Sequence, residues 1–200
     1  MLLHLRPITH ARNGHMRPIS INAYQLAAAL PKIQPGLQKY SAIQALVKAD
    51  TTGFKDPILR RSYNGFYRVR RGPLWQSAYF DLMHQTQKRG YGFSEVFTAL
   101  HRTTGRYEAS FASKLVATLD TSQPVIDSVV LKNLGCKLPT ATSTQRLQNI
   151  VALYSDLQQN VQSFLSSVEG RALVGQFKAS FPHHTVSDEK AVDLVLWQMR

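Results

Sequence analysis

Arginine and aromatic residues are concentrated in residues 60–75, which read RRSYNGFYRVRRGPLW and contain no acidic residue. A guanidinium group can form two parallel hydrogen bonds with phosphate oxygens, and it also stacks on flat rings. Neighbouring aromatic side chains can stack on an unpaired base or wedge beside it. The stretch therefore favours a surface that binds a polyanion. The predicted phosphate contacts are Arg60, Arg61, Arg68, Arg70 and Arg71, with Lys88 and Arg89 further along the chain.

A lysine and an aspartate that could act together lie in residues 108–135, EASFASKLVATLDTSQPVIDSVVLKNLG. On a helix, apolar residues 112, 115, 116 and 119 form one stripe, and Lys114 falls on the opposite side among small residues. A ligand could therefore approach its amine closely. Pro124 then leads into a second helix with Asp127 in its first turn. The small neighbours of Lys114 are Ser110, Ser113 and Ala117.

Ordinary structural roles compete with chemistry at these positions. An aspartate at the start of a helix is commonly an N-cap, which contributes about 1 kcal/mol and needs no ligand. Lys114 could equally be a solvated surface lysine. The aromatic residues Phe66 and Trp75 could pack in the core while the neighbouring arginines solvate a turn. From the sequence, both interpretations stay open.

The elements that must position these residues are predicted to be helical. Apolar residues recur at helical spacing along most of the chain, and only residues 66–71 alternate in a strand-like way over a very short stretch. We expect an all-α fold, a compact bundle of about eight helices. A single helical domain would cover residues 19–200, with an irregular arm over residues 1–18.

Proline, glycine and serine residues mark the predicted helix boundaries. A short first helix is expected to end before Pro31, and a second helix lies around Ile43. Pro73 suits the first position of a helix that runs to Arg89. The last helix begins after Ser187 as its N-cap. Further predicted caps or ends are Ser94, Gly105, Gly135, Ser143 and Pro182.

The net positive charge is confined to one part of the chain. The formal net charge is +12, and residues 1–119 contain 17 Lys and Arg against 5 Asp and Glu, whereas residues 120–200 contain 7 of each. Such asymmetry favours nucleic acid as a partner, since unpaired like charges repel one another unless a polyanion is present. The single cysteine, Cys136, excludes an internal disulfide, a zinc site of several thiolates and an iron–sulfur cluster.

Residues 124–135, PVIDSVVLKNLG, resemble the segment that carries the essential aspartate in the helix-hairpin-helix DNA glycosylase superfamily, which includes 8-oxoguanine DNA glycosylases. Residues 110–114, SFASK, lie where that family has its hairpin and, in bifunctional members, its lysine. The C-terminal KAVDLVLWQ, around Asp193, is weakly similar to the helix that closes the family's fold. The chain departs from the family at the hairpin, where Ser110 and Ala112 replace two glycines, and in a shorter link from lysine to aspartate.

The resemblance implies a glycosylase-like helical fold and cleavage of the N-glycosidic bond of a damaged or modified base. Asp127 would stabilise the oxocarbenium character that develops at the sugar C1′. Lys114 would attack C1′ and form a Schiff base, which would give the enzyme lyase activity. The base must leave the stack first, and Tyr67 and Trp75, together with Arg68, are the candidates to wedge or stack beside it.

These expectations define a partner class and its alternatives. We expect a monomer that binds duplex DNA carrying a lesion, without cofactor or metal, because the histidines lack ligand spacing. No apolar run approaches the about 20 residues that span a bilayer, so we expect no membrane partner and a cytoplasmic location. One alternative is a non-enzymatic nucleic-acid-binding module of the same fold. Another is a scaffold whose basic face meets an acidic protein.

Overall fold

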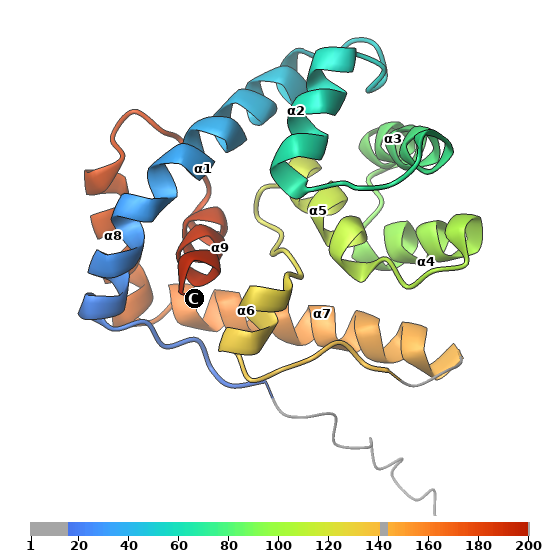
Figure 1. The fold of residues 1–200 in the computed structure, drawn as a ribbon. Helices are drawn as coiled ribbons and strands as arrows, with labels where there is room; N and C mark the ends of the chain where they lie inside the picture. The colour runs from blue at the N-terminus through green and yellow to red at the C-terminus, as the bar shows by residue number, and fades with distance from the viewer. Residues whose placement is uncertain (1–15, 141–143, 200) are drawn as a thin grey trace, which may run out of the picture.

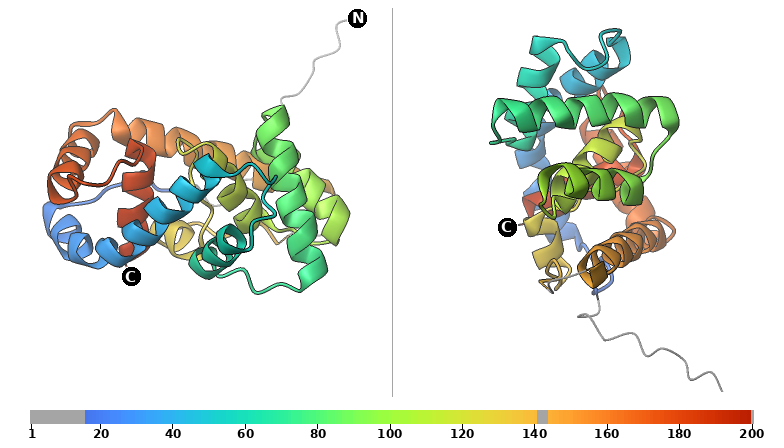
Figure 2. Two further views of the ribbon diagram at one scale, coloured as in Figure 1. Left: turned by 90° about the horizontal axis from the view of Figure 1, so that it is seen from above. Right: turned by 90° about the vertical axis from the view of Figure 1, so that its right-hand side faces the viewer.

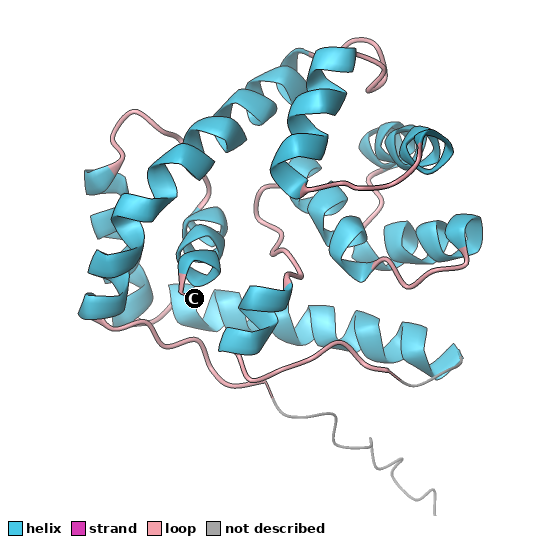
Figure 3. Ribbon diagram, in the orientation of Figure 1, coloured by secondary structure: helices cyan, strands magenta, loops and turns pink. Residues whose placement is uncertain are grey.

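Nine α-helices and no β-strand are formed by residues 16–140 and 144–199, the parts of the chain described by the structure, a computed structural model (Figures 1 and 3). The expected all-α class is confirmed. The helices in chain order are α1 (Ala23–Ala49), α2 (Pro57–Tyr67), α3 (Pro73–Arg89), α4 (Phe93–Thr104), α5 (Ala109–Leu119), α6 (Ser128–Asn133), α7 (Thr144–Leu165), α8 (Val168–Ser180) and α9 (Asp188–Gln198).

The C-terminal helix α9 lies in the middle of the arrangement and contacts α1, α6, α7 and α8. The long helix α1 crosses one side and contacts both α2 and α9, while α3, α4 and α5 pack together on the other side (Figures 1 and 2). Helix α7 runs along the base of Figure 1 and contacts α4, α8 and α9. Buried apolar side chains form one continuous cluster from Ile19 to Leu196, so α2, α5, α6 and α9 are all anchored to the same core.

The predicted boundary at Pro31 is wrong, because α1 continues from Ala23 to Ala49 with Pro31 and Pro35 inside it. Each proline removes one backbone N–H donor, which would normally weaken the helix. Both prolines lie on the exposed side, and the opposite side buries Ile33 and Leu37 almost completely. Burial of that apolar face keeps the chain helical, and α1 bends instead of ending (Figure 1).

The strand-like alternation of residues 66–71 does not correspond to a strand. Helix α2 reaches Tyr67, and it begins after Asp56, whose carboxylate accepts hydrogen bonds from the N–H groups of Ile58 and Leu59. Arg68 then adopts φ 54° and ψ 46°, a left-handed conformation that ends the helix. Arg68 and Arg70 therefore lie on an irregular connection to α3, and Val69 between them is buried.

Several predicted boundaries are confirmed by the local geometry. Pro73 is the first residue of α3, and Gly105 ends α4 with φ +67°. The Ser187 side chain accepts a hydrogen bond from the N–H of Lys190 and caps α9. Helix α4 begins at Phe93 and not after Ser94, with the Glu95 carboxylate accepting the Gly92 N–H. The predicted cap Ser143 lies outside the described residues.

The described end of the predicted arm lies against the helical core. The N–H of Arg17 donates to the carbonyl of Leu134 at 2.9 Å, and the Asn160 amide donates to the Arg17 carbonyl at 2.8 Å. Residues 1–15 of that arm lie outside the described residues. Among the helices that the structure describes, none combines the length and the apolar character needed to cross a bilayer.

Candidate active site

Lys114 and Asp127 line the same pocket, which has a volume of about 280 Å³. Helix α5 contributes Lys114, and Asp127 stands at the N-terminus of α6. The other walls come from three helices. Helix α1 contributes Gly36, the C-terminal end of α2 contributes Arg68, and α9 contributes Lys190 and Asp193. Five helices thus bring two amines, two carboxylates and a guanidinium group to one small cavity.

The Lys114 amine is partly buried and has no carboxylate as a salt-bridge partner among the described residues. Its Nζ donates a long hydrogen bond of 3.5 Å to the Tyr67 carbonyl and lies 5.4 Å from the centre of the Phe111 ring. Burial lowers the pKa of Lys114, and the Asp127 and Asp193 carboxylates offset this only in part. A larger fraction of the amine is therefore neutral than for a surface lysine, as a nucleophile requires.

The helix face around Lys114 is less open than the small residues suggested. Ser113 and Ala117 are both buried, and the segment that leads to α6 contacts Ser113 directly. The Ser113 hydroxyl accepts a hydrogen bond from the N–H of Ile126 at 2.9 Å and donates to the Ser110 carbonyl. Of that face, Lys114 alone lines the pocket. The same contacts hold Asp127, the residue after Ile126, at a fixed place relative to α5.

Asp127 is both an N-cap and a pocket residue. Its Oδ1 accepts a hydrogen bond from the N–H of Val129 at 2.8 Å, which satisfies one of the unpaired donors at the start of α6. Its Oδ2 accepts no hydrogen bond from the part of the chain that is described, and the side chain is partly exposed. One oxygen is therefore structural, and the other is available to a ligand.

Sequence reasoning missed the second amine of the pocket. Lys190 is buried, and its Nζ lies 2.7 Å from Oδ2 of Asp193 and 4.6 Å from the centre of the Tyr40 ring. Burial alone would lower the pKa of Lys190, but Asp193 raises it above its ordinary value. The i, i+3 spacing of a lysine and an aspartate in the first turns of α9 was the available signal.

The predicted basic residues divide into two groups. Arg71 forms two hydrogen bonds of 3.1 Å with the buried Glu108 carboxylate, and the Nε of Arg60 donates to the Phe54 carbonyl. These two guanidinium groups are engaged in the fold and are poorly placed for phosphate. The residues that are exposed are Arg61, Arg68, Arg70, Lys88 and Arg89.

The aromatic residues predicted to wedge or stack beside a base are largely packed against the protein, and Tyr67 also lines the pocket. Tyr67 is 6% exposed, and its hydroxyl accepts a hydrogen bond from Thr118. Trp75 stacks on Tyr79 with ring centres 4.9 Å apart. The adjacent Leu74, which sequence reasoning missed, is 90% exposed at the start of α3. An apolar residue directly after a helix-starting proline in a basic stretch was the available signal.

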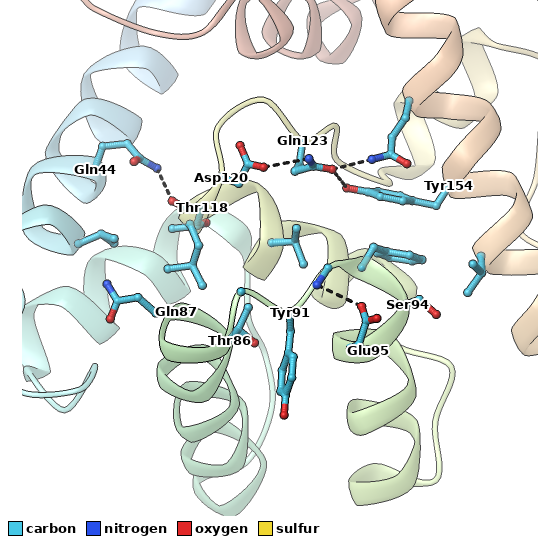
Figure 4. Close-up of a pocket in the computed structure, with 18 of the residues that line it drawn as sticks. Gln44, Thr86, Gln87, Tyr91, Ser94, Glu95, Thr118, Asp120, Gln123 and Tyr154 are labelled. Atoms are coloured by element: carbon cyan, nitrogen blue, oxygen red, sulfur yellow. Dashed lines mark hydrogen bonds between the residues drawn. The ribbon is translucent and has the colours of Figure 1, made fainter.

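A larger groove of about 1040 Å³ lies between α1, α3, α4, α5 and α7 and contains none of the predicted site residues (Figure 4). The Gln123 carbonyl oxygen accepts hydrogen bonds from Tyr154 and Gln158, and its amide donates to Asp120 (Figure 4). Its charged lining within the described chain is one lysine and two acidic residues. This charge suits a phosphate backbone poorly, so the smaller pocket is the better candidate.

In the described part of the chain, no group of three or more His, Cys, Asp and Glu side chains is arranged to hold a metal ion. No family model, no curated protein and no solved structure matches the chain.

Proposed function

We propose that the protein binds DNA and removes a damaged or modified base, with Lys114 as nucleophile and Asp127 as the stabilising carboxylate. The observation that carries this proposal is the shared pocket, which is lined both by a partly buried amine and by a carboxylate; within the described residues, the amine has no salt bridge and one carboxylate oxygen accepts no hydrogen bond. A pocket of about 280 Å³ is close to the size of a single small ligand and suits one extruded nucleotide.

The chemistry follows from the state of each group. The neutral Lys114 amine attacks C1′ while the C1′–N bond breaks, and the bonding electron pair leaves with the base, which takes up a proton. The Asp127 carboxylate stabilises the positive charge that develops at C1′. The attached nitrogen then loses a proton, the C1′–O4′ bond breaks with its electron pair going to O4′, and O4′ takes up a proton, which opens the sugar ring and leaves a protonated Schiff base on Lys114. The lowered pKa of Lys114 supports its role as the attacking group.

Contact with the DNA backbone is proposed for the exposed basic residues nearest the pocket. Arg68 lines the pocket, and Arg70 is exposed two residues further along the same connection. The connection is held by Arg71, which pairs with Glu108, and by Gln76, whose amide donates to the Arg71 carbonyl. Guanidinium groups on a rigid connection keep their positions relative to the pocket, which suits phosphate recognition.

Leu74 takes the wedge role in this proposal, because Tyr67 is nearly buried in the pocket wall and Trp75 is stacked on Tyr79. It is 90% exposed at the end of the connection that carries Arg68 and Arg70. Proteins that open a base step often insert an apolar side chain between neighbouring bases. An exposed leucine beside arginines fits this use, since phosphate contacts hold the duplex while the side chain enters the stack.

Borohydride trapping on duplexes that carry a panel of lesions tests the proposal. The wild type should form a covalent protein–DNA adduct on at least one lesion, and Lys114→Ala should form none. Base release and strand scission are measured on the same duplexes. The absence of both products across the panel would exclude the enzyme.

The N-cap bond of Asp127 favours one alternative, a DNA-binding module without activity, because the aspartate already has a structural function. In that case the wild type binds duplexes in a salt-dependent manner but releases no base. Binding and release assays on the same lesion panel separate the two functions.

A further inference from the structure

We propose that Lys190 keeps Asp193 away from Lys114, so that the ion pair within α9 leaves the Lys114 amine free to react. The inference rests on the proposed function only in naming Lys114 as the nucleophile. Lys190 would be a positioning residue and not a catalytic one, because it acts on the carboxylate beside Lys114 and not on substrate.

Lys190 and Asp193 form a short, nearly buried ion pair within α9. Lys190 and Asp193 lie one turn apart on α9, and both line the pocket together with Lys114. The Nζ to Oδ2 distance is 2.7 Å, and the two side chains are 6% and 15% exposed. A charged hydrogen bond this short, with so little access for water, fixes the carboxylate on its own helix.

The two amines of the pocket differ in their contacts and therefore in their reactivity. Lys190 is buried, paired with Asp193 and covered by the Tyr40 ring, so it remains protonated and cannot act as a nucleophile. Lys114 has no salt-bridge partner among the described residues, and its contacts are the long hydrogen bond to the Tyr67 carbonyl and the faces of the Tyr67 and Phe111 rings. The pocket therefore contains one amine that is ion-paired within its own helix and one amine that is not.

Charged groups of both signs surround the Lys114 amine. Asp127 faces it from the start of α6, Asp193 and Lys190 from α9, and Arg68 from the end of α2. Both carboxylates favour the charged amine, and Lys190 and Arg68 oppose it. Without Lys190, Asp193 would be a nearly buried carboxylate with no partner. Lys114 is the nearest remaining amine of the pocket to neutralise it, and a salt bridge there would hold Lys114 protonated.

The test measures the amine directly and needs no DNA. The full chain is treated with formaldehyde and cyanoborohydride over a range of pH, and mass spectrometry follows the alkylation of each lysine. In the wild type, Lys114 should react at lower pH than the exposed Lys55, while Lys190 stays unmodified. Alkylation of Lys190 together with Lys114 would overturn the ion pair, and this measurement requires no substitution.

Substitutions then identify the cause. Lys190→Met should move the Lys114 profile to higher pH, with alkylation at neutral pH slower by about tenfold for each pKa unit gained. Adding Asp193→Asn to that variant should restore alkylation of Lys114, since the competing carboxylate is gone. Lys190→Arg should behave as the wild type. Equal profiles in Lys190→Met and the wild type, or a double variant as slow as the single one, would refute the proposal.

The outcome is separable from that of the proposed function. A failure of every lesion to react leaves the alkylation profiles unaffected, and these still decide the role of Lys190. Conversely, base release by the wild type together with an unchanged profile in Lys190→Met would refute the role of Lys190 alone.

Discussion

The Oδ1 atom of Asp127 accepts the N–H of Val129 at 2.8 Å, while the same carboxylate lines the pocket that contains Lys114. A structural bond and a proposed chemical function thus use different oxygens of one side chain. Substitutions that keep one oxygen and change the charge can separate the two.

Asp127→Asn is expected to abolish activity without unfolding the protein. The asparagine oxygen can still accept the Val129 N–H, so the free energy of unfolding should change little. Loss of the negative charge should reduce base release by roughly 100-fold or more, the range for removal of one electrostatic contact to a transition state. Asp127→Ala should in addition lose about 1 kcal/mol of stability. Urea unfolding and base-release assays check both, and full release by Asp127→Asn would leave Asp127 as a cap alone.

Lys114→Met is expected to stabilise the protein at neutral pH. Burial lowers the pKa of Lys114 below its ordinary value of 10.5, so the fold disfavours the charged amine. The penalty is full at pH values below the folded-state pKa, and it disappears as the pH rises through that pKa and above 10.5. Thermal melts should therefore show a higher Tm for the variant at neutral pH and a smaller difference at alkaline pH. A lower Tm at neutral pH is the contrary result.

Arg70 and Arg71 are adjacent but should respond differently to substitution by glutamine. Arg71→Gln leaves the 8% exposed Glu108 carboxylate without its partner and should cost roughly 2 kcal/mol, less than for a fully buried pair because Arg71 is 32% exposed. Arg70→Gln should leave stability unchanged and reduce the slope of log affinity against log salt by about one. Denaturant melts and DNA titrations over a salt series measure these effects. An unchanged salt slope would remove Arg70 from the interface.

Leu74→Ala is expected to weaken activity on duplex substrates while leaving the fold intact. The side chain is 90% exposed, so its truncation removes little packing. If it fills the space left by an extruded base, base release from a duplex should fall more than release from the same lesion in a single strand. Val168→Ala is the matched control, since Val168 is 75% exposed on α8 and does not line the pocket. Equal losses on duplex and single strand would argue against a wedge.

Gly36→Ala is expected to stabilise α1 and to narrow the pocket. A Cβ at residue 36 would meet no atom within 4 Å, and Gly36 lines the pocket. Alanine should add about 1 kcal/mol of helix stability. The added methyl group should reduce turnover of the bulkiest accepted base more than that of the smallest. Urea melts and a comparison of lesions check this, and uniform turnover would place the base elsewhere.

Proline and glycine in the sequence predicted helix boundaries correctly where their effect on the backbone decided the boundary. Pro73 and Gly105 mark true helix ends, because proline lacks a donor and glycine tolerates positive φ. The same rule was wrong at Pro31, where burial of Ile33 and Leu37 outweighs the missing bond. Tertiary packing decided that case, and periodicity within a short window does not report it.

The site was predictable only in the part that a short motif carries. Lys114 and Asp127 lie on consecutive helices and line one pocket, and it was the resemblance of residues 110–114 and 124–135 to one family's motifs that singled them out as a pair. Lys190 and Asp193 come from a helix more than 60 residues away in the chain, and only the packing of α9 brings them there. The pairing of Arg71 with Glu108 likewise depends on the fold, which is why Arg71 could not be separated in advance from its exposed neighbours.

The two prolines inside α1 have a mechanical consequence. Pro31 and Pro35 each lack the N–H group that would donate a helical i to i−4 hydrogen bond, and both come shortly before Gly36. This segment of α1 forms one wall of the pocket. A helix that lacks donors beside a glycine bends at lower cost than the uninterrupted turns on either side. The more easily bent helix is thus α1, whereas the amines and carboxylates of the pocket are held by α5, α6 and α9. A bulky ligand would therefore be accommodated by bending of α1, which contributes neither the amines nor the carboxylates of the pocket.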